Sequence, residues 1–143
     1  MPDYQKKVVE TYLQSGMAPP GGYFNASGRA YPDMSAFSVS CSTLNKGRYY
    51  PVDGTSCSTP IVAGIVALLN DVRLNNGMKT LGFLNPLLYQ VLNGEGFIDV
   101  TEGENSYDPS FCPGFKSVHG WDPASGWGSP NFGLLRTLVL QTL

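Results

Sequence analysis

The sequence has 143 residues, of which 42% are hydrophobic and 14% are charged, with a formal net charge of -2. These values are typical of one globular domain with enough apolar residues to form a core. A weakly acidic chain without a cluster of lysine and arginine gives no electrostatic reason to expect a nucleic-acid partner. The apolar stretch at residues 61–69 is too short to cross a bilayer, so we expect no membrane insertion.

The first half of the chain predicts two helices with a hairpin between them. Apolar side chains at helical spacing indicate a helix over residues 3–14, and Gly, Pro and Asn in residues 15–29 indicate a loop. Two strand-like runs, residues 35–42 and 48–52, are expected to pair as a hairpin. Residues 58–75 are apolar on nearly every side, which predicts a helix buried against other elements.

The second half predicts two more helices around a loop-rich region. Residues 84–92 indicate a helix with Asn85 as its N-cap and Pro86 at its first position. A long stretch rich in Gly, Pro and Asp follows, with one short strand at residues 97–100, before a last helix at residues 131–142. So few short strands cannot make a complete α/β sheet, so we expect the chain to be part of a larger α/β domain.

The N-terminus and one triplet give conflicting indications of the compartment. The first residues are polar and amphipathic and lack the apolar core of a secretory signal. The triplet Asn25-Ala26-Ser27, in contrast, is an acceptor pattern for N-glycosylation, which has meaning only in a secreted or lumenal protein. The two agree if Met1 is not the start of the natural protein.

Three cysteines, Cys41, Cys57 and Cys112, are widely spaced and show no metal-binding pattern, so we expect no zinc. A disulfide from Cys41 or Cys112 to a partner elsewhere and three inert thiols both remain open interpretations.

The segment Gly-Thr-Ser-Cys-Ser-Thr-Pro at residues 54–60 is the most informative stretch. Ser56 comes where a strand-like run turns into a helix, so its hydroxyl could be exposed while helical N–H groups face a bound carbonyl. Gly54 permits an unusual backbone conformation there. The competing interpretation is ordinary capping, with Ser58 or Thr59 as the N-cap and Pro60 at the first helical position.

A serine nucleophile needs a base, and the single histidine, His119, lies far along the chain in a Gly-rich loop. A Ser-His-Asp arrangement is therefore poorly supported.

The nucleophile segment resembles that of subtilisin-like serine peptidases, and specifically of the sedolisin family. The sequence of residues 23–33 is most similar to that of the tripeptidyl-peptidase members of the family. The resemblance extends from residue 3 to residue 143, with several motifs in the same order. Besides residues 54–60, these motifs are residues 29–33 (RAYPD), 83–89 (FLNPLLY), 97–101 (FIDVT), 120–123 (GWDP) and 126–132 (GWGSPNF).

The resemblance implies the C-terminal portion of a subtilisin-like, three-layer α/β peptidase domain built on a parallel sheet. In that interpretation, residues 1–143 divide into a nucleophile turn with a buried helix at 56–76, calcium-binding loops at 97–130 and a C-terminal helix at 131–143.

The resemblance also implies the chemistry. Ser56 would be the nucleophile, with a Glu base oriented by an Asp and a second Asp stabilising the oxyanion, all on segments upstream of this chain. None of Asp3, Glu10, Asp33 or Asp53 matches those motifs, so we expect the isolated chain to be inactive. The implied function is release of N-terminal tripeptides from peptide or protein substrates at acidic pH, in a lysosomal or secreted protein, together with the missing N-terminal part of the domain. Asp53 and Cys57 stand where the family has Ser and Ala.

By the same resemblance, one structural Ca²⁺ would be bound by the carboxylates of Asp99 and Asp122 and the carbonyls of Val100, Val118 and Gly120. Oxygen ligands of this kind suit calcium, although Val118 stands where the family usually has Gly. The alternative is that Asp99 only ends a strand and Asp122 only starts an Asp-Pro turn.

Two other functions stay open. One is a non-catalytic, calcium-stabilised fragment or pseudo-enzyme, and the other, disfavoured by the single histidine, is a true subtilisin with His119 as base.

Overall fold

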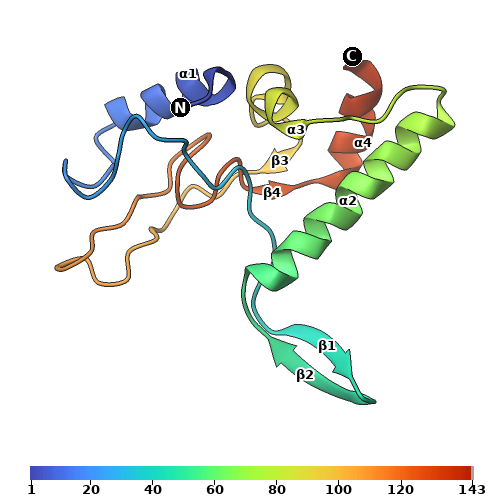
Figure 1. Ribbon diagram of the computed structural model, residues 1–143, viewed down its shortest axis with the longest axis horizontal. Helices are drawn as coiled ribbons and strands as arrows, with labels where there is room; N and C mark the ends of the chain where they lie inside the picture. The colour runs from blue at the N-terminus through green and yellow to red at the C-terminus, as the bar shows by residue number, and fades with distance from the viewer. Residues whose placement is uncertain (143) are drawn as a thin grey trace.

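The computed structural model describes residues 1–142 and combines helices with two small antiparallel strand pairs (Figure 1). The helices are α1 (Asp3–Gln14), α2 (Thr55–Asn75), α3 (Leu84–Pro86), the π-helical turn η1 (Leu87–Leu92) and α4 (Phe132–Gln141). The strands are β1 (Cys41–Asn45), β2 (Arg48–Val52), β3 (Phe97–Ile98) and β4 (Ser129–Pro130). Both pairs are antiparallel, so the parallel sheet of a subtilisin-like domain does not form within the described residues.

Strands β1 and β2 form a hairpin that projects away from the rest of the chain (Figure 1). Lys46 and Gly47 form its turn with φ angles of 49° and 78°, the left-handed geometry that two-residue hairpin turns require. The expected strand at residues 35–42 is wrong, because pairing begins only at Cys41. Cys41 pairs with Val52, the last residue of β2. After Val52 the chain turns at Gly54 into α2, so residues 35–40 have no strand opposite them.

The second strand pair is also shorter than expected. Phe97 faces Pro130 and Ile98 faces Ser129, so the strand predicted over residues 97–100 stops at its second residue. Pro130 has no N–H to donate, which limits the pairing on that side.

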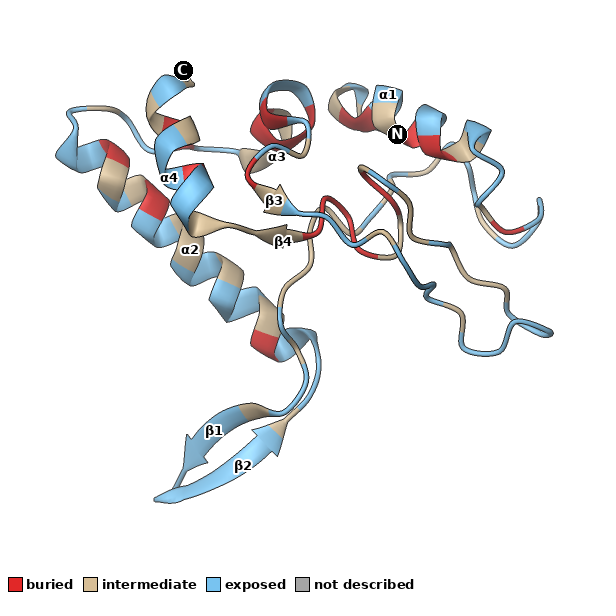
Figure 2. Cartoon of the chain, turned by 180° about the vertical axis from the view of Figure 1, so that it is seen from behind, coloured by how far each residue is buried: buried red, intermediate tan, exposed pale blue. Residues whose placement is uncertain are grey.

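Helix α2 is the longest element, and it is much more exposed than the sequence predicted. Leu69 is buried, but Ile61, Leu68 and Leu74 are 39%, 54% and 58% exposed. One side of the helix packs on α4, while the remainder faces solvent (Figures 1 and 2). An apolar helix of this kind needs neighbours on every face, which residues 1–142 do not supply.

By length and composition, α2 could cross a membrane, since it has 21 residues and contains an 18-residue window with a mean hydropathy of 1.3. The expectation that no apolar segment is long enough is therefore wrong. A core helix of a larger domain meets the same criterion, and α2 packs on α4 along one side only.

The core extends from α1 and the loop that precedes β4, through η1, to the buried residues of α2 and α4 (Figure 2). Tyr89 occupies its centre, with ring centroids 6.4 Å from Trp121 and 5.8 Å from Trp127. Tyr12 of α1 contacts Trp121 edge-on at 6.2 Å. Both tryptophans are almost fully buried, so they pack the loops rather than project outward.

The expected helix at residues 84–92 is present, but Asn85 is not its N-cap. Phe83 occupies the N-cap position, and the side-chain amide of Asn85 instead donates to Asp33 Oδ1 at 3.2 Å. The last helix begins as predicted, because the Asn131 side chain accepts a hydrogen bond from Leu134 N–H. Leu143, the end of the predicted 131–143 segment, lies outside the described residues.

Candidate active site and calcium loop

The nucleophile segment begins at Gly54, which is the N-cap of α2 and has a φ of 116°. This conformation is costly for residues with a Cβ, so the expectation that Gly54 supplies special backbone geometry is confirmed. Its N–H donates to the Ser38 carbonyl at 2.7 Å, and its carbonyl accepts from Cys57 N–H at 2.9 Å. Ser56 therefore lies in the first turn of the helix, with its side chain exposed.

The capping interpretation of this segment is wrong. The helix starts three residues before Ser58, whose hydroxyl donates to the Ala36 carbonyl at 3.0 Å and so ties α2 to the preceding loop. The Thr59 hydroxyl donates back to the Thr55 carbonyl at 2.8 Å. Pro60 lies inside the helix rather than at its first position.

The position of Pro60 has a direct consequence for Ser56. In an α-helix the N–H of residue 60 would bond to the carbonyl of Ser56, and proline has no N–H. The Ser56 hydroxyl, for its part, makes no hydrogen bond with any residue in the described part of the chain. It lies at the positive end of the helix dipole, beside N–H groups that have no helical partner.

Neither Asp53, three residues before Ser56, nor His119, the single histidine, forms a hydrogen bond with Ser56. Asp53 accepts a hydrogen bond from the Ser40 N–H at 2.5 Å. His119 is 94% exposed, and its Nδ1 lies 3.6 Å from Asp99 Oδ2. A Ser-His-Asp arrangement therefore does not form within residues 1–142, and the structure gives the subtilisin alternative no support.

Asp33 anchors the loop that lies across from the start of α2. Its carboxylate accepts two hydrogen bonds from Arg29, at 2.9 and 2.7 Å, and the two residues form an ion pair. Tyr89 also donates to it at 2.8 Å; burial first, and then this contact, raises the pKa of Tyr89. Residues 33–36, the beginning of α2 and the α3–η1 helix line an open cavity of about 370 Å³.

Asp99 and Asp122, two of the predicted calcium residues, both bond to the backbone of residues 118–120. Asp122 is fully buried; its Oδ1 accepts from the N–H groups of Ala124 and Ser125 at 2.9 and 2.8 Å. Its Oδ2 accepts from Val118 N–H at 3.0 Å. Asp99 Oδ2 accepts from Gly120 N–H at 2.9 Å, so both carboxylates hold the 118–120 loop from two sides.

The oxygen atoms of this loop are free for a cation only in part, because both carboxylate oxygens of Asp122 already accept hydrogen bonds from N–H groups of the chain. The carbonyl oxygens of Val100, Val118 and Gly120 accept no hydrogen bond from residues 1–142, which leaves them free as ligands. Asp99 keeps one carboxylate oxygen without a donor. No group of three or more His, Cys, Asp or Glu side chains gathers anywhere in the described chain, so a cation here depends on backbone carbonyls.

Two positioning residues were not identified from the sequence. The Tyr12 hydroxyl donates to the Lys116 carbonyl at 2.9 Å and so fixes the chain just before the 118–120 loop against α1. Gln5 is fully buried on the same helix and binds the backbone of Ala30. The sequence does place Gln5, a polar residue, on the apolar face of an amphipathic helix. That position does not identify the residue to which Gln5 bonds.

A second missed feature is the proximity of Cys41 and Cys57. The Cys57 thiol donates to the Val52 carbonyl at 3.4 Å, and Val52 is the cross-strand partner of Cys41. Their spacing in the sequence gave no indication of this arrangement.

Comparisons with known proteins agree with this geometry. Residues 13–82 match the model of the subtilase family. Tripeptidyl-peptidase 1 of Rattus norvegicus is 47% identical, and that of Homo sapiens 48% identical, each over 96% of this chain. The chain spans about a quarter of the length of these relatives, 25% in each case.

Among solved structures, a Pseudomonas sedolisin, a serine-carboxyl proteinase, is similar with a TM-score of 0.58 and 28% identity. The match covers 67% of this chain and 25% of that protein, which supports an α/β, subtilisin-like fold for the region. The chain belongs to the sedolisin family of serine-carboxyl peptidases.

Proposed function

We propose that this chain supplies the nucleophile, Ser56, of a peptidase that releases tripeptides from the free N-termini of peptide or protein substrates. The observation that carries the proposal is the placement of the Ser56 hydroxyl, exposed and uncommitted at the start of α2. The identity to Tripeptidyl-peptidase 1 of two mammals supports the tripeptidyl specificity. In this proposal residues 1–143 are the C-terminal part of the catalytic domain.

In the proposed reaction, the Ser56 oxygen attacks the carbonyl carbon of a peptide bond while a carboxylate base takes the hydroxyl proton. The resemblance to sedolisins assigns the base to a Glu oriented by an Asp, and the oxyanion to a further Asp, outside this chain. Backbone N–H groups of the first turn of α2 face the developing negative charge. The products are a tripeptidyl ester on Ser56 and a shortened peptide, and water then releases the tripeptide.

A carboxylate base sets the operating pH. Its pKa lies near 4 in the absence of perturbation, so it titrates at about pH 4 to 5 rather than at neutrality. That chemistry suits a lysosomal or secreted protein in an acidic compartment.

The structural role proposed for the second site is to bind one calcium ion. Asp99 and Asp122 would supply carboxylate oxygens, with the carbonyls of Val100, Val118 and Gly120. The free carbonyl oxygens and the buried Asp122 support this assignment. The ion would supply positive charge that fixes the loop, and it takes no part in the chemical step.

The test of the catalytic proposal is a chimera in which this chain replaces the matching quarter of Tripeptidyl-peptidase 1 of Homo sapiens. We expect release of a fluorophore from a tripeptide substrate at about pH 4.5, lost in Ser56→Ala and retained in the matched control Ser42→Ala. The isolated chain should release no more fluorophore than its Ser56→Ala variant.

The alternative is a non-catalytic, calcium-stabilised pseudo-enzyme. It is favoured by the absence, within residues 1–142, of any acidic side chain that bonds to Ser56. A folded chimera without Ser56-dependent turnover would support this alternative and overturn the catalytic proposal.

A further inference from the structure

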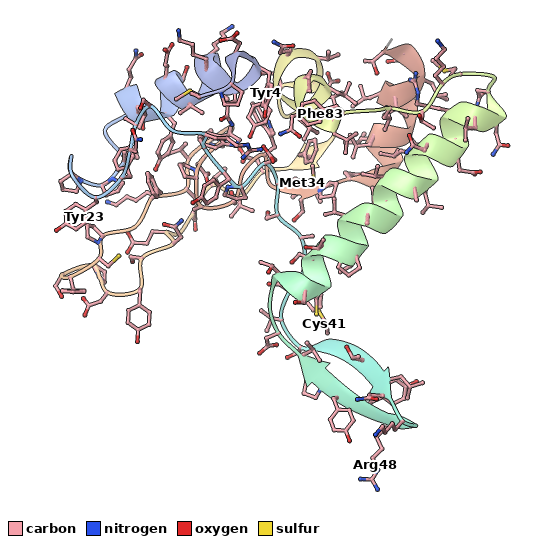
Figure 3. The ribbon with its side chains drawn as sticks, viewed as in Figure 1. Tyr4, Tyr23, Met34, Cys41, Arg48 and Phe83 are labelled. Carbon is pink, nitrogen blue, oxygen red and sulfur yellow. The ribbon has the colours of Figure 1, made fainter. Side chains whose placement is uncertain are left out.

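The base of the β1–β2 hairpin brings two cysteines together beside the nucleophile segment. Figure 3 shows Cys41 at the base of this hairpin, next to the beginning of α2. Cys57 lies in the first turn of α2, and its thiol donates to the Val52 carbonyl at 3.4 Å. Val52 is paired with Cys41 across the hairpin. Since cross-strand partners have Cα atoms about 4.5 to 5.5 Å apart, the Cys57 sulfur lies next to Cys41.

Independent contacts hold the two segments in this arrangement. Gly54 N–H donates to the Ser38 carbonyl at 2.7 Å, and Ser40 N–H donates to Asp53 Oδ1 at 2.5 Å. These bonds join the chain just before Cys41 to the chain just before the helix. The two thiols therefore approach each other because the backbone on both sides is fixed.

We infer that Cys41 and Cys57 form a disulfide that ties the hairpin to the first turn of α2. The bond closes residues 41–57 into a loop and holds the Asp53 to Ser56 segment between its ends. The remaining cysteine, Cys112, is exposed on another loop and has no part in the pair.

The reaction needs an oxidant, for which a low-molecular-weight disulfide such as oxidised glutathione suffices. One protein thiolate attacks a glutathione sulfur and displaces one glutathione as its thiolate, which takes a proton. The second protein thiol, on losing its proton, attacks the mixed disulfide and displaces the other glutathione. The two protein thiols lose two electrons and two protons, which leave in two molecules of reduced glutathione.

The local electrostatics also bear on when the bond forms. The pKa of Cys41 is raised to about 11, chiefly by its interaction with the Cys57 thiol, then by desolvation and by the Asp53 carboxylate. Because thiolates are the species that exchange, the reaction is slow in acid and proceeds near neutral or mildly alkaline pH. A bond formed there persists when the pH falls. The pairing itself does not depend on the proposed peptidase function.

The test is oxidation of the full chain by oxidised glutathione at about pH 8, followed by alkylation, trypsin digestion without reduction and mass spectrometry. Cleavage at Lys46 and Arg48 separates the two cysteines, so the disulfide joins residues 30–46 to residues 49–73. Cys112 lies in the separate peptide of residues 80–116. We expect the 30–46/49–73 pair to dominate and to persist in Cys112→Ser.

Denatured chain provides the reference. In concentrated guanidinium chloride the three pairings compete by chain entropy alone, whereas the effective concentration of the Cys41–Cys57 pair in native buffer should be at least about tenfold higher. An equal value in the two solvents, or native-state linkage mainly through Cys112, would overturn the inference. Activity of the chimera is a separate measurement, so failure of the peptidase proposal does not affect this outcome.

Discussion

The side chain of Gln5 and the backbone of Ala30 form a closed pair of hydrogen bonds. Gln5 Nε2 donates to the Ala30 carbonyl at 3.0 Å, and Ala30 N–H donates to Gln5 Oε1 at 2.9 Å. Gln5 is fully buried. Its side chain bonds to the Ala30 backbone as a neighbouring strand would, and these bonds hold the loop before Asp33 against α1.

Replacing Gln5 by Leu should lower the stability of the chain, because it leaves the N–H and the carbonyl of Ala30 without partners. The expected loss is about 2 to 6 kcal/mol, from two unsatisfied groups that cost about 1 to 3 kcal/mol each. Urea titration followed by circular dichroism measures it. Gln14→Leu, at the exposed end of the same helix, is the matched control, and equal midpoints for the two variants would contradict the assignment.

Tyr12 should make stability depend on alkaline pH. Burial, followed by the charge of Asp122, raises the pKa of Tyr12 from 10.0 to about 12. A group whose pKa is higher in the folded state contributes stability that is complete below pH 10 and is lost as the pH rises to about 12. The unfolding free energy should therefore fall through this window in the natural chain and fall less in Tyr12→Phe. Tyr107→Phe, at a 96% exposed position, should leave the natural profile unchanged.

Gly54 and Gly64 should respond in opposite directions to alanine. Gly54 has a φ of 116°, so Gly54→Ala forces a Cβ into a strained conformation and should cost about 1 to 3 kcal/mol. Gly64 lies within α2 and a Cβ there meets no described atom within 4 Å, so Gly64→Ala should stabilise the isolated chain by about 0.5 to 1 kcal/mol. Thermal unfolding of both variants tests the contrast. A destabilising Gly64→Ala only in the chimera would show that another element packs on that face.

Adjacent leucines on α2 offer a second test of the exposed face. Leu69 is 4% exposed, so Leu69→Ala should cost about 2 to 5 kcal/mol. Leu68 is 54% exposed, and Leu68→Ala should change the stability of the isolated chain by no more than about 0.5 kcal/mol. In the chimera, Leu68→Ala should become strongly destabilising. If it stays neutral there, the proposed larger domain does not cover this face.

Removal of calcium should lower the melting temperature of the chimera if the 118–120 loop binds the ion as proposed. We expect a chelator to shift the transition of the natural sequence downward and to leave Asp99→Asn unaffected, because that variant loses one of the two carboxylate ligands. Asp108→Asn, at an exposed carboxylate, is the control and should respond like the natural sequence. An equal chelator response in Asp99→Asn and Asp108→Asn would exclude Asp99 as a ligand.

Features with local causes could be predicted from the sequence. Helical spacing of apolar residues located α1, a last helix was expected from residue 131, and the two strand-like runs indicated the hairpin. The sequence of residues 54–60 indicated Ser56 as the candidate nucleophile and indicated the family. Each of these depends on residues close together in the chain.

Features that depend on distant contacts required the tertiary structure. Asn85 could have capped its own helix, but Asp33 lies within reach of its amide, so the side chain turns to Asp33 instead. Residues 35–40 have strand-like composition but no partner strand, and a strand needs one for its backbone hydrogen bonds. The meeting of Cys41 and Cys57 likewise follows from a hairpin folding back on a helix. The sequence by itself determined the elements and the candidate nucleophile, whereas only the tertiary structure decided which polar groups and thiols find partners, because those distances are set by packing.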